Sequence, residues 1–325
     1  MSAAACSAAA GSARSSPSDL RRPGDRAARD GSGEQLAECV VNFSEGRDLA
    51  VVAAIGTAGG DRVLDVHSDP THHRSVLTLG GPLDAVEAAA RSVVAQAVEL
   101  IDLRAHAGVH PRFGVADVVP FVTLPETVST AAGWDAVLGA RNRLANWAGE
   151  ELALPCFLYG PERSLPDVRR RAFSTLAPDT GPPRPHPSAG AAAVGARGVL
   201  VAYNVWLAGS DDGDADVTQV ARSIAADVRG PAVRALGFAL ESGAQVSVNL
   251  IDPAKVGIEA VYDRVASAAE SRGCRVLRAE LVGLVPATVL EAVPPRRWAE
   301  LDLSEGSTIE RRLDTAGASP GTPGH

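Results

Sequence analysis

Residues 63–104, VLDVHSDPTHHRSVLTLGGPLDAVEAAARSVVAQAVELIDLR, decide the fold. Val63–His67 predicts a strand, and Arg74–Leu79 alternates apolar and polar residues as a second strand after the Asp69-Pro70 turn. From about Asp84 to Arg104 the apolar residues recur at helical spacing, which predicts an amphipathic helix. The stretch therefore predicts a strand-turn-strand unit followed by a long helix.

The segments on either side extend this unit into a repeated order of elements. We expect strands at 38–42, 115–122 and 155–159 and helices at 49–57 and 134–150, so that the first half contains the order β-α-β-β-α-β. The second half repeats that order, with strands at 198–207, 236–240, 245–251 and 275–284 and helices at 215–229 and 256–271. The sequence predicts an α/β (α+β) fold of two tandem ferredoxin-like, split-βαβ subdomains.

Segments rich in small residues, Pro and Gly set the expected boundaries. Residues 1–34 predict a disordered tail, 35–198 an N-terminal catalytic subdomain, 199–300 a C-terminal subdomain, and 301–325 a C-terminal helix with a disordered tail. Residues 177–195 contain five prolines, which argues against regular structure. We interpret them as a linker or as a loop over a ligand.

Composition narrows the class of protein. The 325 residues are 46% hydrophobic and 22% charged with a net charge of −8, as in an ordinary globular protein without general affinity for nucleic acid. No apolar run reaches the length of a membrane span. The four cysteines form no CxxC pair, and Cys39 and Cys156 lie in strand-like runs that predict buried thiols. We expect a cytoplasmic protein; an organellar transit peptide in the leader is the alternative.

The stretch RAHAGVHPRFGVAD, residues 104–117, contains the candidate chemistry. His110 precedes Pro111, which favours an extended backbone and suits a metal-free acid/base at a loop. Arg112 can bind a substrate carboxylate with two hydrogen bonds. We expect His106 to cap the preceding helix, whereas Asp117 either orients a catalytic group or ends a turn.

A metal site is the alternative for this stretch. His106 and His110 have the spacing of a zinc pair on a helix, but Gly108 and Pro111 oppose a helix and no glutamate follows His106. Folding of His67, His72 and His73 against His110 would still build a multi-histidine hydrolase site. We therefore expect no metal and keep a metal-dependent amidohydrolase as a reserve hypothesis.

An ordered set of motifs resembles the glutamate formimidoyltransferase (formiminotransferase) family. The motifs run from about residue 36 to 295: Glu38-Cys-Val-Val-Asn-Phe-Ser-Glu-Gly46, His73-Arg-Ser-Val76, His110-Pro-Arg-Phe-Gly-Val-Ala-Asp117, Asn204, Gln245-Val-Ser-Val-Asn-Leu250 and Glu280-Leu-Val-Gly-Leu-Val-Pro286. The resemblance implies a stand-alone transferase without a cyclodeaminase domain. It also implies a folate cleft between the subdomains and a homodimer.

The same resemblance implies the reaction and the site. Family members move the formimidoyl group of N-formimidoyl-L-glutamate to N5 of tetrahydrofolate, the co-substrate, in histidine degradation. The histidine before Pro-Arg, His110, is implied as general acid/base, and we assign Arg74 and Arg112 to the substrate carboxylates by charge and position. The implied folate contacts are Gly181, Pro182, Pro187, Gly190, Asp227, Val228 and Arg229.

Departures from the family pattern concern the folate contacts. Ala189 replaces a tryptophan found in some members, Arg184 and His186 are unusual within the loop, and Asp227 stands where members have an amide. Two further alternatives stay open. One is a formyl transfer from 5-formyltetrahydrofolate to glutamate at the same site, and the other is a folate-binding protein without catalysis.

Overall fold

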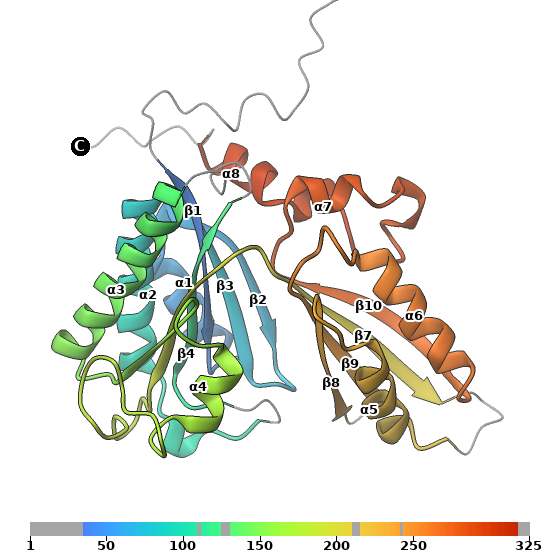
Figure 1. Ribbon diagram of the computed structural model, residues 1–325, viewed down its shortest axis with the longest axis horizontal. Coiled ribbons are helices and arrows are strands. Elements are labelled where there is room, and N and C mark those ends of the chain that lie inside the picture. Colours follow the sequence, from blue (N-terminus) through green and yellow to red (C-terminus); the bar gives the residue numbers. More distant parts are fainter. Residues whose placement is uncertain (1–34, 109–111, 125–130, 210–214, 241–242, 318–325) are drawn as a thin grey trace, which may run out of the picture. The chain divides into compact units, whose positions relative to one another are not determined.

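The computed structural model describes residues 35–108, 112–124, 131–209, 215–240 and 243–317. These residues form two sheets, one of six strands and one of four, and most of the helices cover one face of each sheet (Figure 1). Within these ranges no helix is long and apolar enough to cross a membrane. The prediction of two tandem α/β subdomains is confirmed.

The first subdomain contains the larger sheet, in the order β2-β3-β1-β4-β6-β5. Strands β1, β2, β3 and β4 are antiparallel neighbours, and with α1 and α2 they make the predicted β-α-β-β-α-β unit. Helix α1 begins where Asp48 accepts the backbone N–H groups of Ala50 and Val51. The bounds are β1 Leu36–Phe43, α1 Leu49–Ala58, a 3-10 turn Gly60–Arg62, β2 Val63–Asp69, β3 Arg74–Pro82, α2 Leu83–Leu100, a 3-10 turn Leu103–Ala105, β4 Ala116–Thr123, α3 Ala131–Glu151, β5 Cys156–Tyr159, α4 Leu165–Arg171 and β6 Ala192–Arg197.

Strand β6 corrects the linker interpretation of residues 177–195. Its first four residues lie inside that segment, and the strand runs parallel to both β4 and β5, between them. Its small side chains fit this central position. A Cβ on Gly195 would lie 2.1 Å from the Tyr159 ring, so a larger residue could not pair there.

The long predicted helix also ends earlier than expected. Helix α2 stops at Leu100, and Ile101 has extended backbone angles. Asp102 then accepts the backbone N–H of Arg104 and starts the short 3-10 turn. The carbonyl of Ser188 accepts the N–H of Leu103 at 2.9 Å, which ties this turn to the predicted linker.

The second subdomain is a four-stranded antiparallel sheet in the order β10-β7-β9-β8. Helices α5 and α6 pack on one of its faces over a core that includes Tyr203, Ile224 and Val265. The bounds are β7 Val201–Gly209, α5 Val217–Val228, β8 Val233–Leu240, β9 Gly243–Leu250, α6 Ile258–Glu270 and β10 Cys274–Val282.

The last described segment returns to the first subdomain. It contains α7 Ala287–Glu291, 3-10 turns Pro295–Arg297 and Glu305–Ser307, and α8 Ile309–Gly317. Ile309 packs in a small core with Leu64, Leu124 and Leu284. The N–H of Ile309 donates to the Val285 carbonyl at 2.9 Å. The C-terminal helix therefore joins the strand that ends the second sheet to the edge of the first.

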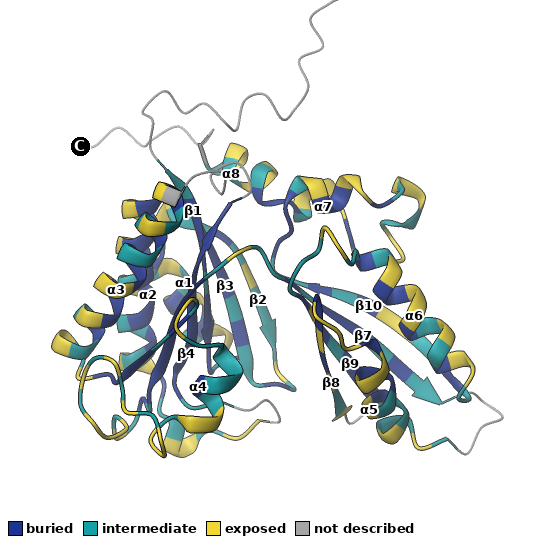
Figure 2. Cartoon of the chain, in the orientation of Figure 1, coloured by how far each residue is buried: buried dark blue, intermediate teal, exposed yellow. Residues whose placement is uncertain are grey.

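Both sheets bury their helix-covered faces (Figure 2). Cys39 and Cys156 are fully buried, as predicted, and burial raises the pKa of the Cys156 thiol to about 12. Neither thiol is ionised near neutral pH. The opposite faces carry many more polar side chains and line the candidate site, and α4 packs on part of this face of the first sheet.

Candidate functional site

A cavity of about 1330 Å³ is lined by strands of both sheets and by the segment around α4. This volume exceeds the 300–1,000 Å³ of an ordinary small-ligand pocket, so the cavity has room for two small molecules at once. Alternate residues of β1 form part of its wall, namely Glu38, Val40 and Asn42. From the second sheet it takes Asn204, Ser247, Asn249 and residues of β8.

The charge on the cavity wall is opposite to that of the whole chain. Of the described residues, seven arginines line the cavity, against the two carboxyl-bearing residues Glu38 and Asp69; the arginines are Arg74, Arg163, Arg169, Arg170, Arg197, Arg229 and Arg234. A local excess of positive charge in an acidic protein attracts small anions. The cavity is therefore suited to ligands that carry carboxylates.

One end of the cavity is a cationic cluster around Asp117. This carboxylate is 1% exposed; it accepts the backbone N–H of Phe113 at 2.9 Å and pairs with Arg169 at 2.6 Å. The guanidinium of Arg74 donates to the Asn42 side chain. Burial lowers the pKa of Arg74 to about 10; Asp117 opposes this effect, while Arg169 and Arg112 add to it. Arg74 is charged at neutral pH, and a second anion bound beside it would stabilise this charge.

Arg112 lies beside this cluster, although it is not among the residues that line the cavity. Its guanidinium contacts the ring of His106, with 2.9 Å between Nη1 and Nε2, and donates to the His72 carbonyl at 3.3 Å. The structure thus brings Arg74 and Arg112, our two predicted carboxylate ligands, into one cluster. His110 lies outside the described residues. The nearest described residues on either side in the chain, Gly108 and Arg112, both pack against the turn between β2 and β3.

The two described histidines of this cluster stack on each other. The rings of His73 and His106 are 3.8 Å apart between centroids and nearly parallel. His106 therefore packs on the turn and does not cap α2, which corrects our expectation. Nδ1 of His73 faces the Ala107 carbonyl at 2.9 Å and Nε2 faces the Glu45 carboxylate at 3.0 Å. Both ring nitrogens of His73 therefore face oxygen atoms that can accept a hydrogen bond.

The histidines of the predicted multi-histidine site have different partners. Nε2 of His72 is 2.8 Å from Oε1 of the buried Gln245, which joins the two subdomains. His67 instead lies 3.7 Å from Glu280 on β10. Over the ranges that the structure describes, no three His, Cys, Asp or Glu side chains gather as metal ligands.

The other end of the cavity contains a buried carboxyl group. Glu38 is 5% exposed, and burial raises its pKa to about 7, although Arg197 lowers it; Glu310 adds to the rise. Thr78, on the adjacent strand, is 1% exposed. Four residues along a strand span ~13 Å, so Glu38 and Asn42 lie at well-separated positions of the cavity wall.

The predicted folate loop is ordered against the first subdomain. Gly181 and Gly190 have positive φ, and a Cβ on Gly190 would lie 2.2 Å from the Phe113 carbonyl. The backbones of His186 and Gly190 exchange two hydrogen bonds, at 2.7 and 3.0 Å. Gly181, Pro182, Pro187 and Gly190 are not part of the cavity wall as described. The loop adjoins Phe113 and Leu103, on both sides of the segment that carries His110.

The three predicted folate residues on and after α5 differ in their surroundings. Arg229 lines the cavity and donates through Nε to the Ala235 carbonyl at 2.8 Å. Val228 is 2% exposed and packs in the second core. Asp227 pairs with Arg272 at 2.7 Å on the outer surface. Only the side chain of Arg229 therefore faces the space in which a ligand would lie.

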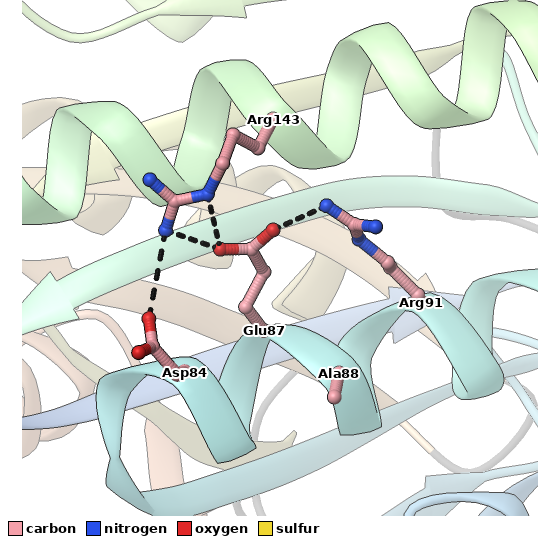
Figure 3. A pocket seen from close by; sticks show the side chains of 5 residues that line it. All are labelled: Asp84, Glu87, Ala88, Arg91 and Arg143. Atoms are coloured by element: carbon pink, nitrogen blue, oxygen red, sulfur yellow. Dashed lines mark hydrogen bonds and ion pairs between the residues drawn. The ribbon is translucent and has the colours of Figure 1, made fainter.

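A smaller pocket on α2 and α3 is a closed ionic cluster (Figure 3). Glu87, 6% exposed, pairs with Arg143 and Arg91, each at 2.5 Å, and Asp84 lies 3.8 Å from Arg143. The charges pair with one another, so this cluster joins the two helices.

Arg169, Thr78 and Glu38 are among the residues of the main cavity that sequence reasoning missed, and Glu38 was quoted only within a motif. Arg169 lies on α4, which the Ser164-x-x-Asp167 capping box and Pro166 signal. Glu38 and Thr78 alternate with core residues along their strands, so a polar residue on an otherwise apolar strand was the available signal.

Comparison with known proteins identifies the relatives. The family model described as "Formiminotransferase domain, N-terminal subdomain" matches residues 36–197, and "Formiminotransferase domain" matches residues 202–296. The chain is 36% identical to the glutamate formimidoyltransferase of Streptococcus pyogenes serotype M1, over 79% of this chain and 91% of that one. It is 35% identical to the glutamate formimidoyltransferase of Thermoplasma acidophilum, over 86% and 98%.

The formimidoyltransferase-cyclodeaminase of Sus scrofa is 37% identical over 79% of this chain but only 51% of its own length. A solved microcompartment protein of Desulfitobacterium hafniense DCB superposes with a TM-score of 0.18 and 12% identity, too low to imply a shared fold.

Together the tandem subdomains and these relatives define an enzyme that transfers one-carbon groups. More particularly, the chain belongs to the formiminotransferase family, whose two subdomain models match most of the described residues.

Proposed function

We propose that this protein transfers the formimidoyl group of N-formimidoyl-L-glutamate to N5 of tetrahydrofolate in histidine degradation. The observation that supports this most strongly is the 1330 Å³ cavity with its excess of arginines, in a chain of this family. Both substrates carry carboxylates, and the cavity has room for both. Holding two reactants together supplies the largest part of such an acceleration.

In this proposal the cationic cluster binds the donor. Arg74 and Arg112 hold the carboxylates of formimidoylglutamate, and Arg169 adds positive charge beside them. N5 of tetrahydrofolate attacks the formimidoyl carbon to give a tetrahedral intermediate. His110 takes the proton from N5 and returns it to the departing glutamate nitrogen, which contributes ~10²–10⁴-fold. No metal takes part.

Folate contacts complete the proposal. Arg229 reaches the cavity directly, and Asp227 and Val228 contribute at most backbone contacts. The loop with Gly181, Pro182, Pro187 and Gly190 adjoins Leu103 and Phe113, where a ligand that extends past the cationic cluster would meet it. Cytoplasmic location, a homodimer, and subdomains at 35–198 and 199–300 belong to the same proposal. Light scattering measures the oligomeric state.

The deciding experiment measures glutamate release from formimidoylglutamate with and without tetrahydrofolate, in EDTA. Release that requires folate and survives EDTA is the expected result. Release without folate that EDTA abolishes would instead establish the metal-dependent amidohydrolase. Consumption of 5-formyltetrahydrofolate and glutamate, with no turnover of formimidoylglutamate, would establish the formyl transfer.

His110 is tested in the same assay. Replacing it by Ala is expected to lower kcat strongly while the Kd for 5-formyltetrahydrofolate changes little. Added imidazole should restore part of the turnover if the lost group is an acid/base. Equal loss of binding and turnover, without rescue, would make His110 a binding residue.

A further inference from the structure

The carboxyl group of Glu38 is buried and faces the cavity, and its burial disfavours the ionised form. It is 5% exposed and lines the wall together with Val40 and Asn42. Within the described part of the chain no hydrogen bond reaches this carboxyl, although Arg197 lies close enough to act on it electrostatically. A buried carboxyl without a hydrogen-bond partner destabilises the fold, so its position calls for a ligand.

Thr78 gives a second, independent observation at the same end of the cavity. Its hydroxyl is buried, lines the cavity and has no hydrogen-bond partner in the ranges described. Thr78 pairs with Val40 across β3 and β1, which places it diagonally to Glu38 on the same face. Diagonal cross-strand neighbours lie ~7–8 Å apart, so one flat ring can reach both side chains.

The second subdomain closes this end of the cavity. A Cβ on Gly283 would lie 3.5 Å from the Thr78 hydroxyl, so the chain after β10 passes directly over Thr78. Leu284, 7% exposed, joins the small core with Ile309 of α8. Gly283 and Leu284 therefore cover the part of the cavity wall that carries Glu38 and Thr78.

We propose that Glu38 and Thr78 recognise a flat heterocycle that presents two adjacent N–H donors. Under the proposed function, on which this inference rests, that group is the 2-amino-4-oxopyrimidine edge of tetrahydrofolate. A carboxylate accepts two parallel N–H donors in a fork geometry, and the threonine hydroxyl donates to or accepts from a neighbouring ring atom.

This assignment orients the folate. The ring edge binds at Glu38, and the cationic cluster lies ~13 Å away along β1. The reacting ring nitrogen then points away from Glu38, toward the end of the cavity where Arg74 and Arg112 hold the donor. Glu38 is thus a specificity-determining residue for the acceptor, separate from the residues that bind the donor.

Ligand binding should be linked to protonation of Glu38. Two N–H donors stabilise the ionised carboxylate, so binding releases a proton wherever the empty site holds Glu38 protonated. The charged or titratable groups around it are Arg197 at the end of β6, Glu310 on α8 and Tyr159 on β5. Burial raises the pKa of Tyr159 to about 12, so Tyr159 stays neutral over the range of the test.

The test is isothermal titration calorimetry of the full chain with three ligands: 5-formyltetrahydrofolate, 6-hydroxymethylpterin and 4-aminobenzoyl-L-glutamate. We expect Glu38→Gln to weaken binding of the first two by about 10–100-fold and to leave the third unchanged. The wild-type affinity for the pterin-containing ligands should fall as the pH drops from 7.5 to 5.5, and Glu38→Gln should remove that dependence. Equal weakening of all three ligands, or of none, would overturn the proposal.

A second pair of variants covers a loss of folding in Glu38→Gln. Thr78→Val is expected to weaken the two pterin-containing ligands a fewfold, whereas Thr123→Val, a buried threonine on the opposite face of β4, should not. Identical behaviour of the two threonine variants would contradict the assignment.

Turnover of formimidoylglutamate distinguishes this inference from the proposed function. If Glu38→Gln shows normal turnover and an unchanged KM for tetrahydrofolate, this inference alone is overturned. Pterin binding that depends on Glu38 without any turnover overturns the proposed function alone.

Discussion

The two ends of the cavity differ in the charge of the side chains that form them. At the cationic end Asp117 pairs with Arg169, and Arg74 and Arg112 lie beside them, so three guanidinium groups surround a single carboxylate. At the other end Glu38 loses its water and gains no hydrogen bond from the described residues, so burial raises its pKa to about 7. One end therefore favours a charged ligand, whereas the other favours a neutral ligand with N–H donors.

The largest expected effect comes from removing the charge that balances the cationic end. Asp117→Ala should lower the free energy of unfolding by about 3–5 kcal/mol, because it removes the buried carboxylate that pairs with Arg169 and opposes the charges of Arg74 and Arg112. Urea denaturation measures this. Lys255→Met is the control, since it breaks an exposed pair with Asp252 and should change nothing measurable. A small effect at Asp117 would mean that the arginines are already well solvated.

The second effect tests the carboxyl end through the pH dependence of stability. The pKa of Glu38 rises from 4.5 in the unfolded chain to about 7 in the fold. The stabilising contribution of this proton is complete below pH 4.5 and is lost as the pH rises through 7, by about 3 kcal/mol in total.

Glu38→Gln should therefore be more stable than wild type at pH 8, and this advantage should shrink toward pH 4.5. Thermal unfolding at several pH values measures it. A stability difference that is independent of pH would show that Glu38 is ionised in the fold throughout this range.

The third effect separates the two ends by substrate. Arg112→Gln should raise the KM for formimidoylglutamate by about 10–100-fold, because a charged hydrogen-bond donor to a carboxylate is lost. The KM for tetrahydrofolate should change little. Steady-state kinetics with each substrate varied in turn checks this, and a matching rise in both KM values would remove the distinction between the ends.

The smallest effect concerns the ionic contact between the subdomains. Glu280 accepts hydrogen bonds from Asn204 and Trp206 at 3.0 Å each and lies 3.7 Å from His67. Glu280→Gln keeps an acceptor and removes a partly exposed charge, so we expect a loss of less than about 1 kcal/mol that disappears in high salt. A larger, salt-independent loss would show that this contact holds the cavity together.

Much of the fold followed from periodicity. The strand pair at 63–82 and the helix that follows it were predicted from alternation and from helical spacing, and the second subdomain was predicted within a few residues. Strand β6 was not predicted, because Ala192–Arg197 consists mainly of small residues without a clear alternation and follows a proline-rich segment. Its place is set by Tyr159 and the flanking parallel strands, which are distant in sequence.

The site was only partly predictable for the same reason. Arg74 and Arg112 were chosen by charge, and the structure brings them together beside Asp117. Arg169 could not be placed there from the sequence, since it arrives on α4 from 52 residues further along the chain. Glu38 alternates with core residues along its strand, and only the tertiary packing decides that its side chain faces a cavity.

The position of α8 has a consequence for the order in which the molecule folds. Its residues Ile309 and Leu313 pack against Leu64 and Gly80, more than 200 residues earlier in the chain. Contacts between such distant segments form late, because a long loop must close first. During synthesis the first sheet can therefore assemble while its polar face is still open, and the binding cavity is completed only when the last helix docks.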